Sequence, residues 1–157
     1  MHPEIIEKYG NRTRIRVCGF CIKEEKWLMV NHKGLTNNDF WALPGGGVEF
    51  GESLEQTLRK EFLEETGIEI TVGQLLFVTE HINKPLHAVE IYFSVEITGG
   101  NLKIGYDPET QLKVVEDVAW LTNKEISQIP DTYKHKLFAN GKGPADCINM
   151  RGYTHLL

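Results

Sequence analysis

The sequence predicts an α/β fold of the α+β kind, in which a few helices pack on a mixed central β-sheet. Three observations predict it. Residues 87–97 alternate between apolar and polar side chains, as a strand does. Two helix starts carry capping boxes, at Ser53 with Gln56 and at Thr122 with Glu125. The other apolar segments are short and bounded by turn residues, which favours further strands over further long helices.

The size and composition indicate one domain spanning residues 1–157. The 157 residues, 41% of them hydrophobic, are enough for one substantial core. The net charge of −5 argues against binding a long nucleic acid through its backbone. No apolar run approaches the ~18 residues that cross a bilayer, and the N-terminus lacks the apolar core of a signal peptide. We therefore expect a cytoplasmic protein with no membrane partner.

The strands are expected at residues 14–22, 26–31, 74–80, 87–97 and 115–121. The polar, turn-rich segment 32–40, between the second and third of these strands, is expected to be an exposed loop. Residues 98–101, Thr-Gly-Gly-Asn, read as a turn that ends the fourth strand. On that strand, Ile91 and Phe93 share one face while Glu90 and Tyr92 share the other.

Cys18 and Cys21 form a C-x-x-C pair inside the first expected strand. Residues three apart on a strand point to opposite faces, so a disulfide or shared zinc ion is disfavoured. A redox pair normally stands at a helix N-terminus, and a zinc site needs two more ligands at suitable spacing. We interpret both residues as small buried hydrophobes.

The first expected helix follows the N-cap Ser53 and stops at Gly67, a residue suited to the left-handed C-cap position. The second follows Thr122 and is interrupted early by Pro130. A third helical stretch is expected over residues 131–140. The tail beyond it fits no single interpretation.

The first helix concentrates acids on one side. Glu61, Glu64 and Glu65 fall within an arc of about 100° beside its apolar stripe. Glu64 and Glu65 also stand in the last turn before Gly67, where the helix dipole disfavours anions by roughly 0.3–1 kcal/mol each. A solvated acidic face, helped by a Lys60–Glu64 pair, is the simpler explanation. The alternative is a divalent cation, and oxygen ligands without histidine or cysteine suit Mg²⁺, with Mn²⁺ as a substitute.

Residues 46–68 resemble the signature of the Nudix hydrolase family, G-x5-E-x7-R-E-U-x-E-E-x-G-U, where U is a bulky aliphatic or apolar residue. The matching residues are Gly46, Glu52, Glu61, Phe62, Glu64, Glu65, Gly67 and Ile68. Lys60 stands where the family has arginine. The preceding segment 41–45, Trp-Ala-Leu-Pro-Gly, is similar to the family's usual lead-in.

The resemblance implies an α/β/α sandwich with a mixed central sheet and a Mg²⁺-dependent reaction. It implies that the glycines at 45–47 lie in a loop whose backbone approaches the metal. It also implies that Glu64, Glu65 and a carbonyl near Gly45 bind the metal, while Glu61 is a third ligand or the general base. Glu52 is implied to be structural, paired with Lys60, and Gly67 to be a structural part of the motif. Because lysine lacks the planar fork of arginine, Lys60 is expected to leave the catalytic carboxylates less well oriented.

The same resemblance suggests where the substrate binds. The substrate-binding candidates are Lys33, Phe40, Gly46, Gly47 and Glu109. Glu109 and Glu116, with Asp107 behind them, are also candidates for a further metal ligand. Phe40, Trp41 and Tyr92 are each either a base-stacking ring or part of the core, and His81 and His87 flank a loop that either borders the pocket or is incidental to it.

The implied function is Mg²⁺-dependent hydrolysis of the diphosphate linkage in a nucleoside diphosphate linked to some moiety X. A nucleoside diphosphate sugar such as ADP-ribose is the leading substrate class, and a nucleoside triphosphate is the next. The alternative is a catalytically weak or inactive domain that binds a nucleotide as a sensor. The partner is a small nucleotide, and a homodimer is left open.

Overall fold

The computed structural model describes residues 3–32, 38–102 and 117–157 and contains two β-sheets. The larger sheet has the strand order β5-β1-β7-β6-β9. Its strands are β5 (Gly45–Gly47), β1 (Arg12–Phe20), β7 (Leu86–Gly100), β6 (Ile68–Asn83) and β9 (Gly152–Leu156). Strand β1 runs parallel to β7, and β6 runs parallel to β9, whereas β1–β5 and β6–β7 are antiparallel. The predicted mixed sheet is confirmed.

The smaller sheet is built around β3. It contains β2 (Ile22–Lys23), β3 (Lys26–Asn31), β4 (Trp41–Ala42) and β8 (Asp117–Thr122), with both β4 and β8 paired to β3. The long first strand that the sequence predicts is interrupted at Cys21, which separates β1 from β2.

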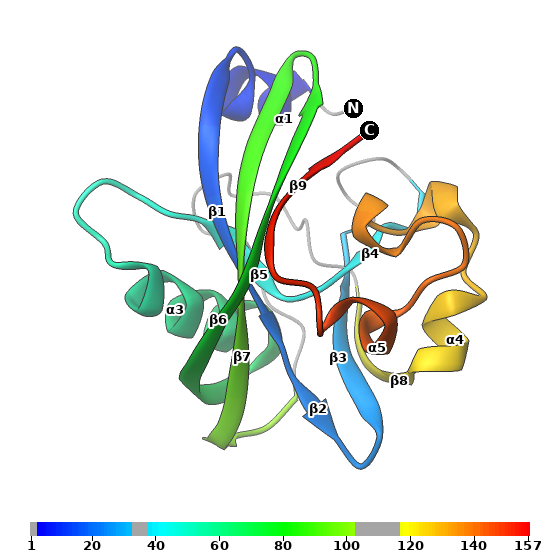
Figure 1. Ribbon diagram of the computed structural model, residues 1–157. Coiled ribbons are helices and arrows are strands. Elements are labelled where there is room, and N and C mark those ends of the chain that lie inside the picture. The colour runs from blue at the N-terminus through cyan, green and yellow to red at the C-terminus, as the bar shows by residue number, and fades with distance from the viewer. Residues whose placement is uncertain (1–2, 33–37, 103–116) are drawn as a thin grey trace.

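Helices pack on both sides of these sheets (Figure 1). The long helix is α3 (Leu54–Thr66), and α1 (Pro3–Tyr9) lies near the start of β1. The opposite side carries α4 (Asn123–Ser127), the 3-10 turns η1 (Asp131–Tyr133) and η2 (Lys136–Phe138), and α5 (Pro144–Cys147). This arrangement is the α/β/α sandwich expected from the sequence.

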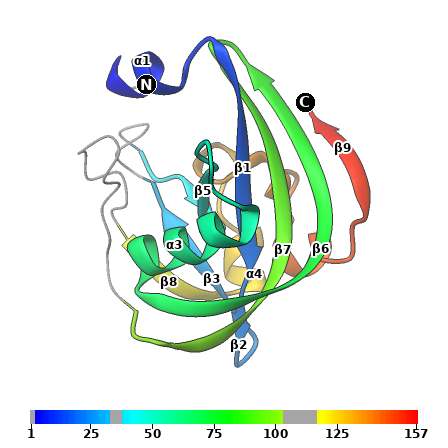
Figure 2. The same ribbon diagram turned by 90° about the vertical axis from the view of Figure 1, so that its left-hand side faces the viewer.

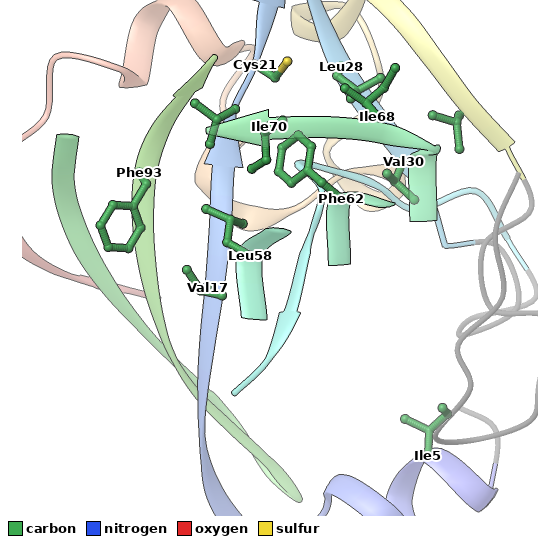
Figure 3. Packing of buried hydrophobic residues seen from close by; sticks show 12 residues of the cluster. Ile5, Val17, Cys21, Leu28, Val30, Leu58, Phe62, Ile68, Ile70 and Phe93 are labelled. Carbon is green, nitrogen blue, oxygen red and sulfur yellow. The ribbon is translucent and has the colours of Figure 1, made fainter. Parts of the chain in front are cut away.

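Two apolar clusters fill the sandwich, one on each side. Figure 3 shows the first, in which Leu58 and Phe62 of α3 pack against Val17 and against β3. The second packs Phe20 and its neighbours against α4, η2 and α5. Cys18 belongs to the second cluster and Cys21 to the first, which confirms that they point to opposite faces.

Both predicted capping boxes are present. Ser53 accepts from the Gln56 N–H and Gly67 closes α3 in the left-handed conformation, with φ at 78°. Thr122 and Glu125 make the same reciprocal pair at the start of α4. No helix in the described part of the chain is long and apolar enough to cross a membrane.

Three element predictions are wrong. The turn expected at 98–101 is mostly strand, because β7 continues to Gly100 opposite Ile68 of β6. The helix expected over 131–140 is two separate 3-10 turns, since the chain becomes extended at Lys134. The glycines at 45–47, expected in a loop, form strand β5 on β1. A glycine run has no side-chain pattern from which a strand can be recognised.

Candidate active site

Helix α3 and strand β5 bring two carboxylates against two successive glycines. The Glu65 carboxylate accepts a hydrogen bond of 2.9 Å from the Gly45 N–H. The Glu61 carboxylate lies against Gly46, where an added Cβ would stand 2.5 Å from the Glu61 Cδ. Glu61 and Glu65, one turn apart on α3, thus contact adjacent residues of β5. Only glycine at position 46 leaves room for the Glu61 carboxylate.

The glycine run, residues 45–47, is therefore needed for close approach rather than for an unusual backbone. None of its φ angles is positive, whereas Gly51 and Gly67 do adopt the left-handed region. An added Cβ at Gly45 would meet the Val17 carbonyl at 2.1 Å. The loop expected at these glycines is therefore corrected to a strand, β5, whose lack of side chains allows the close approach.

Glu65 is the most enclosed of the three acids, with 5% of its surface exposed. Its second oxygen lies 3.6 Å from the His32 Nε2. Burial, followed by the charges of Arg16 and His135, lowers the pKa of His32 to about 3. His32 is consequently neutral at physiological pH and adds no charge beside Glu65.

Lys60 forms the expected ion pair with Glu52. Its ammonium Nζ lies 2.8 Å and 3.1 Å from the two Glu52 carboxylate oxygens. The Thr57 hydroxyl and the Glu49 N–H also donate to Glu52. These donors, led by Lys60, lower the pKa of Glu52 and hold its carboxylate within the motif.

Glu64 stands on the half-buried part of α3 beside Lys60. Burial tends to lower the pKa of Lys60, but Glu52 and then Glu61 and Glu64 raise it. One lysine therefore balances charge for three acids.

The donor set fits a hard divalent cation in its chemistry, because carboxylate and backbone oxygens are the ligands Mg²⁺ prefers. In the described ranges, no three histidine, cysteine, aspartate or glutamate side chains already converge on one metal position. The candidates Lys33, Asp107, Glu109 and Glu116 lie outside the described residues.

A second group of charges, which the sequence did not predict, lies on the other face of β1. Glu90 of β7 is 2% exposed and pairs with Arg16 at 2.5 Å and with His135 at 2.6 Å. Burial alone would raise the pKa of Glu90, but His135 and Arg16 hold it far below its usual value. The three residues line a small cavity of about 10 Å³, room for about one water molecule.

Most of the predicted aromatic and histidine candidates lie away from α3. The Phe40 ring is 6.4 Å from the His135 ring, next to the buried charges. Tyr92 stacks on Phe77 at 4.6 Å and belongs to the core. His87 pairs with Glu80 at 2.6 Å, on the β6–β7 strands.

The three cysteines are buried thiols with raised pKa values. Cys18, Cys21 and Cys147 are all free and buried. Burial raises the pKa of Cys21 and of Cys147 to about 11 and that of Cys18 well above its usual value. Because the thiolate is the reactive form, none of the three is poised for nucleophilic or redox chemistry.

Comparisons with known proteins agree with this architecture. The family model described as NUDIX domain matches residues 12–140. An ADP-ribose pyrophosphatase from Methanocaldococcus jannaschii is 36% identical over 95 residues, which cover 59% of this chain and 56% of that protein. The nucleoside triphosphatase NudI of Enterobacter sp. strain 638 is 30% identical over 144 residues, covering 84% of this chain and 98% of that protein. A solved NUDIX hydrolase structure from Nitrosomonas europaea has a TM-score of 0.65 at 17% identity, covering 90% of this chain and 78% of that chain, which is a likeness of fold.

Proposed function

This chain belongs to the NUDIX family, and from that premise we propose that it is a single-domain Mg²⁺-dependent hydrolase of a diphosphate bond in a small nucleotide. The observation that carries the proposal is the seating of Glu61 and Glu65 against Gly46 and Gly45. Glu65 and its neighbour Glu64 stand in the last turn of α3, where the helix dipole disfavours a carboxylate unless a cation offsets it. A divalent cation is the natural partner for such a pair.

Glu61, Glu64, Glu65 and the Gly45 carbonyl would hold the metal. When bound, Mg²⁺ neutralises charge on the phosphate oxygens and lowers the pKa of the attacking water. The chain's own contribution is to fix the carboxylates: the Gly45 N–H orients Glu65, and the lack of a side chain at Gly46 admits Glu61.

Lys60 and Glu61 have further proposed roles beside the metal. Lys60, paired with Glu52, keeps a positive charge next to Glu61 and Glu64 in the absence of substrate. Glu61, half-buried, is the group that would accept a proton from water if it does not bind the metal.

The leading substrate class is a nucleoside diphosphate sugar such as ADP-ribose, followed by nucleoside triphosphates. Support comes from the relatives, one named an ADP-ribose pyrophosphatase and the other a nucleoside triphosphatase. Of the substrate-binding candidates, Gly46 stands in β5 against the Glu61 carboxylate, and Gly47 follows it and lies against Arg14. Phe40 stands near His135. A cytoplasmic location belongs to the same proposal, and cell fractionation tests it.

The test is a panel of ADP-ribose, UDP-glucose and the nucleoside triphosphates with Mg²⁺, Mn²⁺ or EDTA, with the released phosphate, pyrophosphate and nucleotide identified. We expect metal-dependent hydrolysis of at least one compound and a loss of more than about 100-fold in Glu65→Gln, as for a removed catalytic electrostatic group. The matched control is Glu55→Gln, an exposed acid on the first turn of the same helix. Binding of a nucleotide without turnover would instead support a sensor.

A further inference from the structure

The small cavity on the face of β1 opposite α3 combines charged and apolar walls. Arg16, Glu90 and His135 line it together with apolar residues that include Ala42, Leu43 and Leu137. Its enclosed space of about 10 Å³ admits one water molecule or one polar atom at the edge of a ligand. Figure 2 shows α3 in front of β1 and α4 behind it, so the sheet separates this cavity from α3. Apolar walls with a few fixed polar groups are typical of small-molecule sites.

Glu90 and His135 are already engaged with protein groups. The His135 Nδ1 accepts from the Leu137 N–H at 2.9 Å, so its Nε2 carries the proton that it donates to Glu90 at 2.6 Å. The other carboxylate oxygen of Glu90 accepts from the Arg16 Nη1 at 2.5 Å. With 2% of Glu90 exposed, this carboxylate holds Arg16 in place instead of meeting a ligand.

Arg16 has donors open to a ligand. Within residues 3–32, 38–102 and 117–157, the bond to Glu90 is the one hydrogen bond that its five N–H groups make. In those ranges the Thr79 Oγ1 is the only buried side-chain nitrogen or oxygen without a partner. Solvent therefore reaches each Arg16 nitrogen that makes no hydrogen bond, and 22% of the side chain is exposed.

The charge balance at Arg16 favours an uncharged acceptor over a phosphate. Glu90 already compensates the guanidinium at contact distance. Burial tends to lower the pKa of Arg16, but Glu90 and, more weakly, Glu65 raise it, so a further anion would stand near two carboxylates. A nucleobase offers acceptors without charge. Every purine presents N7 as an acceptor on one edge, including the adenine of the leading substrate class.

The cavity adjoins the carboxylates of α3 at the edge of β5. Arg16 pairs with Gly47, which stands about 7 Å along the strand from Gly45, and the Gly45 N–H holds Glu65. His32 lies between the two places. Its Nε2 is 3.6 Å from Glu65, and burial followed by the charge of Arg16 lowers its pKa to about 3. A diphosphate at Glu65 therefore brings the base linked to it within reach of Arg16.

We propose that Arg16 is a specificity-determining residue that donates a hydrogen bond to N7 of the substrate's purine, whose edge sits at this cavity. The inference rests on the proposed function. Glu90, itself fixed by His135, positions the guanidinium for this contact. The half-buried Phe40 ring, 6.4 Å from the His135 ring, adds aromatic surface beside the cavity.

The experiment compares the binding of AMP with that of 7-deaza-AMP, which has a C–H group in place of N7. Neither compound has a diphosphate bond, so the proposed hydrolysis does not interfere with calorimetry in the presence of Mg²⁺. For the wild type we expect 7-deaza-AMP to bind about tenfold more weakly than AMP, the size of one hydrogen bond to a charged donor.

Variants assign this difference to Arg16. Arg16→Met/Glu90→Gln removes the donors together with the carboxylate that would otherwise be buried without its partner. In this variant the two ligands should bind within about twofold of each other, because the cycle removes the pairwise contact alone. Glu90→Gln keeps the arginine, and Arg12→Met removes an exposed arginine of the same strand, so both should keep the wild-type ratio. Thermal unfolding checks that each variant is folded, and the wild-type comparison needs no variant.

A ratio near one in the wild type, a ratio that persists in Arg16→Met/Glu90→Gln, or a wild type that binds no AMP would each overturn the inference. Turnover is scored separately. Hydrolysis of a nucleotide together with an AMP ratio near one would keep the proposed function and refute the N7 contact. N7-dependent binding that Arg16→Met/Glu90→Gln abolishes, in a protein without hydrolysis, would refute the catalysis and support the contact.

Discussion

Lys60 contacts both carboxylate oxygens of Glu52, although lysine has no planar fork. The ammonium sits between the two oxygens, and Thr57 supplies a further donor to one of them. The sequence-based reason for expecting loosely held carboxylates is therefore weaker than the comparison of lysine with arginine suggested. The acid that Lys60 orients is Glu52, while its effect on Glu61 is through charge.

Lys60 substitutions test this assignment. We expect Lys60→Arg to change kcat by less than about threefold, because arginine can keep the Glu52 contact. Lys60→Ala should lower kcat by about 10- to 100-fold, since Glu61 and Glu64 lose a neighbouring cation and Glu52 is released. Steady-state kinetics at saturating Mg²⁺ measures both. An alanine variant with full turnover would contradict the charge-balancing role.

Gly46→Ala tests the contact with Glu61. The new Cβ would displace the Glu61 carboxylate, so we expect turnover to fall at least 100-fold in steady-state assays. Gly51→Ala is the control for backbone effects: its φ of 90° makes alanine cost about 1–2 kcal/mol, but nothing lies within 4 Å of an added Cβ. If both variants lose activity equally, the close approach of Glu61 is not the reason for glycine at position 46.

At the scale of elements, the segment from η1 to η2 is held by a buried lysine. Lys134 is 1% exposed, and its ammonium donates to the carbonyls of Ile126, Ser127 and Lys142. Two of these carbonyls end α4, so Lys134 acts as a C-cap from outside the helix. It thereby positions the segment that carries His135 over β1 and β7.

Replacing Lys134 should be costly. Lys134→Met leaves buried carbonyls without donors, and we expect the free energy of unfolding to fall by about 2–4 kcal/mol. Lys136→Met, an exposed lysine two residues away, should change it by less than about 0.5 kcal/mol. Urea unfolding monitored by circular dichroism measures both values. Equal stability in the two variants would rule out the capping role.

Local signals in the sequence predicted those elements that carry such signals. The capping boxes at Ser53 and Thr122 mark α3 and α4, and alternation marks β7. Strand β5 was not predicted, because a run of glycines has no alternating side-chain pattern that would indicate its pairing with β1. The extended residue at Lys134 was missed because tertiary contacts, rather than propensity, break the expected helix there.

The same reasoning applies to the candidate site. The acids of α3 share one helix, so rotation about its axis was enough to group them. Arg16, His32, Glu90 and His135 come from four separate segments and meet only in the folded chain. Nothing in the spacing of these four residues signals that they meet.

At the scale of the whole molecule, Glu90 connects segments distant in sequence. Through Arg16 and His135 it ties β1 and the η1–η2 segment to β7. A carboxylate so enclosed stabilises the fold only while both partners compensate its charge. Its contribution to stability must therefore depend on pH.

Stability should fall in acid because of Glu90. Its pKa is lower in the folded protein than its ordinary value of 4.5, so as the pH falls the unfolded chain binds the proton first. The contribution is fully present above pH 4.5 and is lost below it, by up to about 1.4 kcal/mol per pH unit. Urea unfolding between pH 7 and pH 3 should show a shallower acid dependence in Glu90→Gln than in the wild type. Glu96→Gln, exposed on the same strand, should keep the wild-type slope.

The parallel pairing of β1 with β7 also governs how the chain reaches this state. Arg16 and Glu90 stand 74 residues apart, and every β1–β7 pair spans a similar separation. Closing so long a loop costs entropy before any contact repays it, and such topologies fold slowly. A nascent chain that ends before β7 has emerged from the ribosome keeps Val17, Cys18 and Phe20 without their β7 partners, although β5 can already pair with Val17 and Cys18. During synthesis, β1 thus waits for β7 until 74 further residues have been made, and β3 waits longer still, because its partner β8 lies 86 to 96 residues further along the chain.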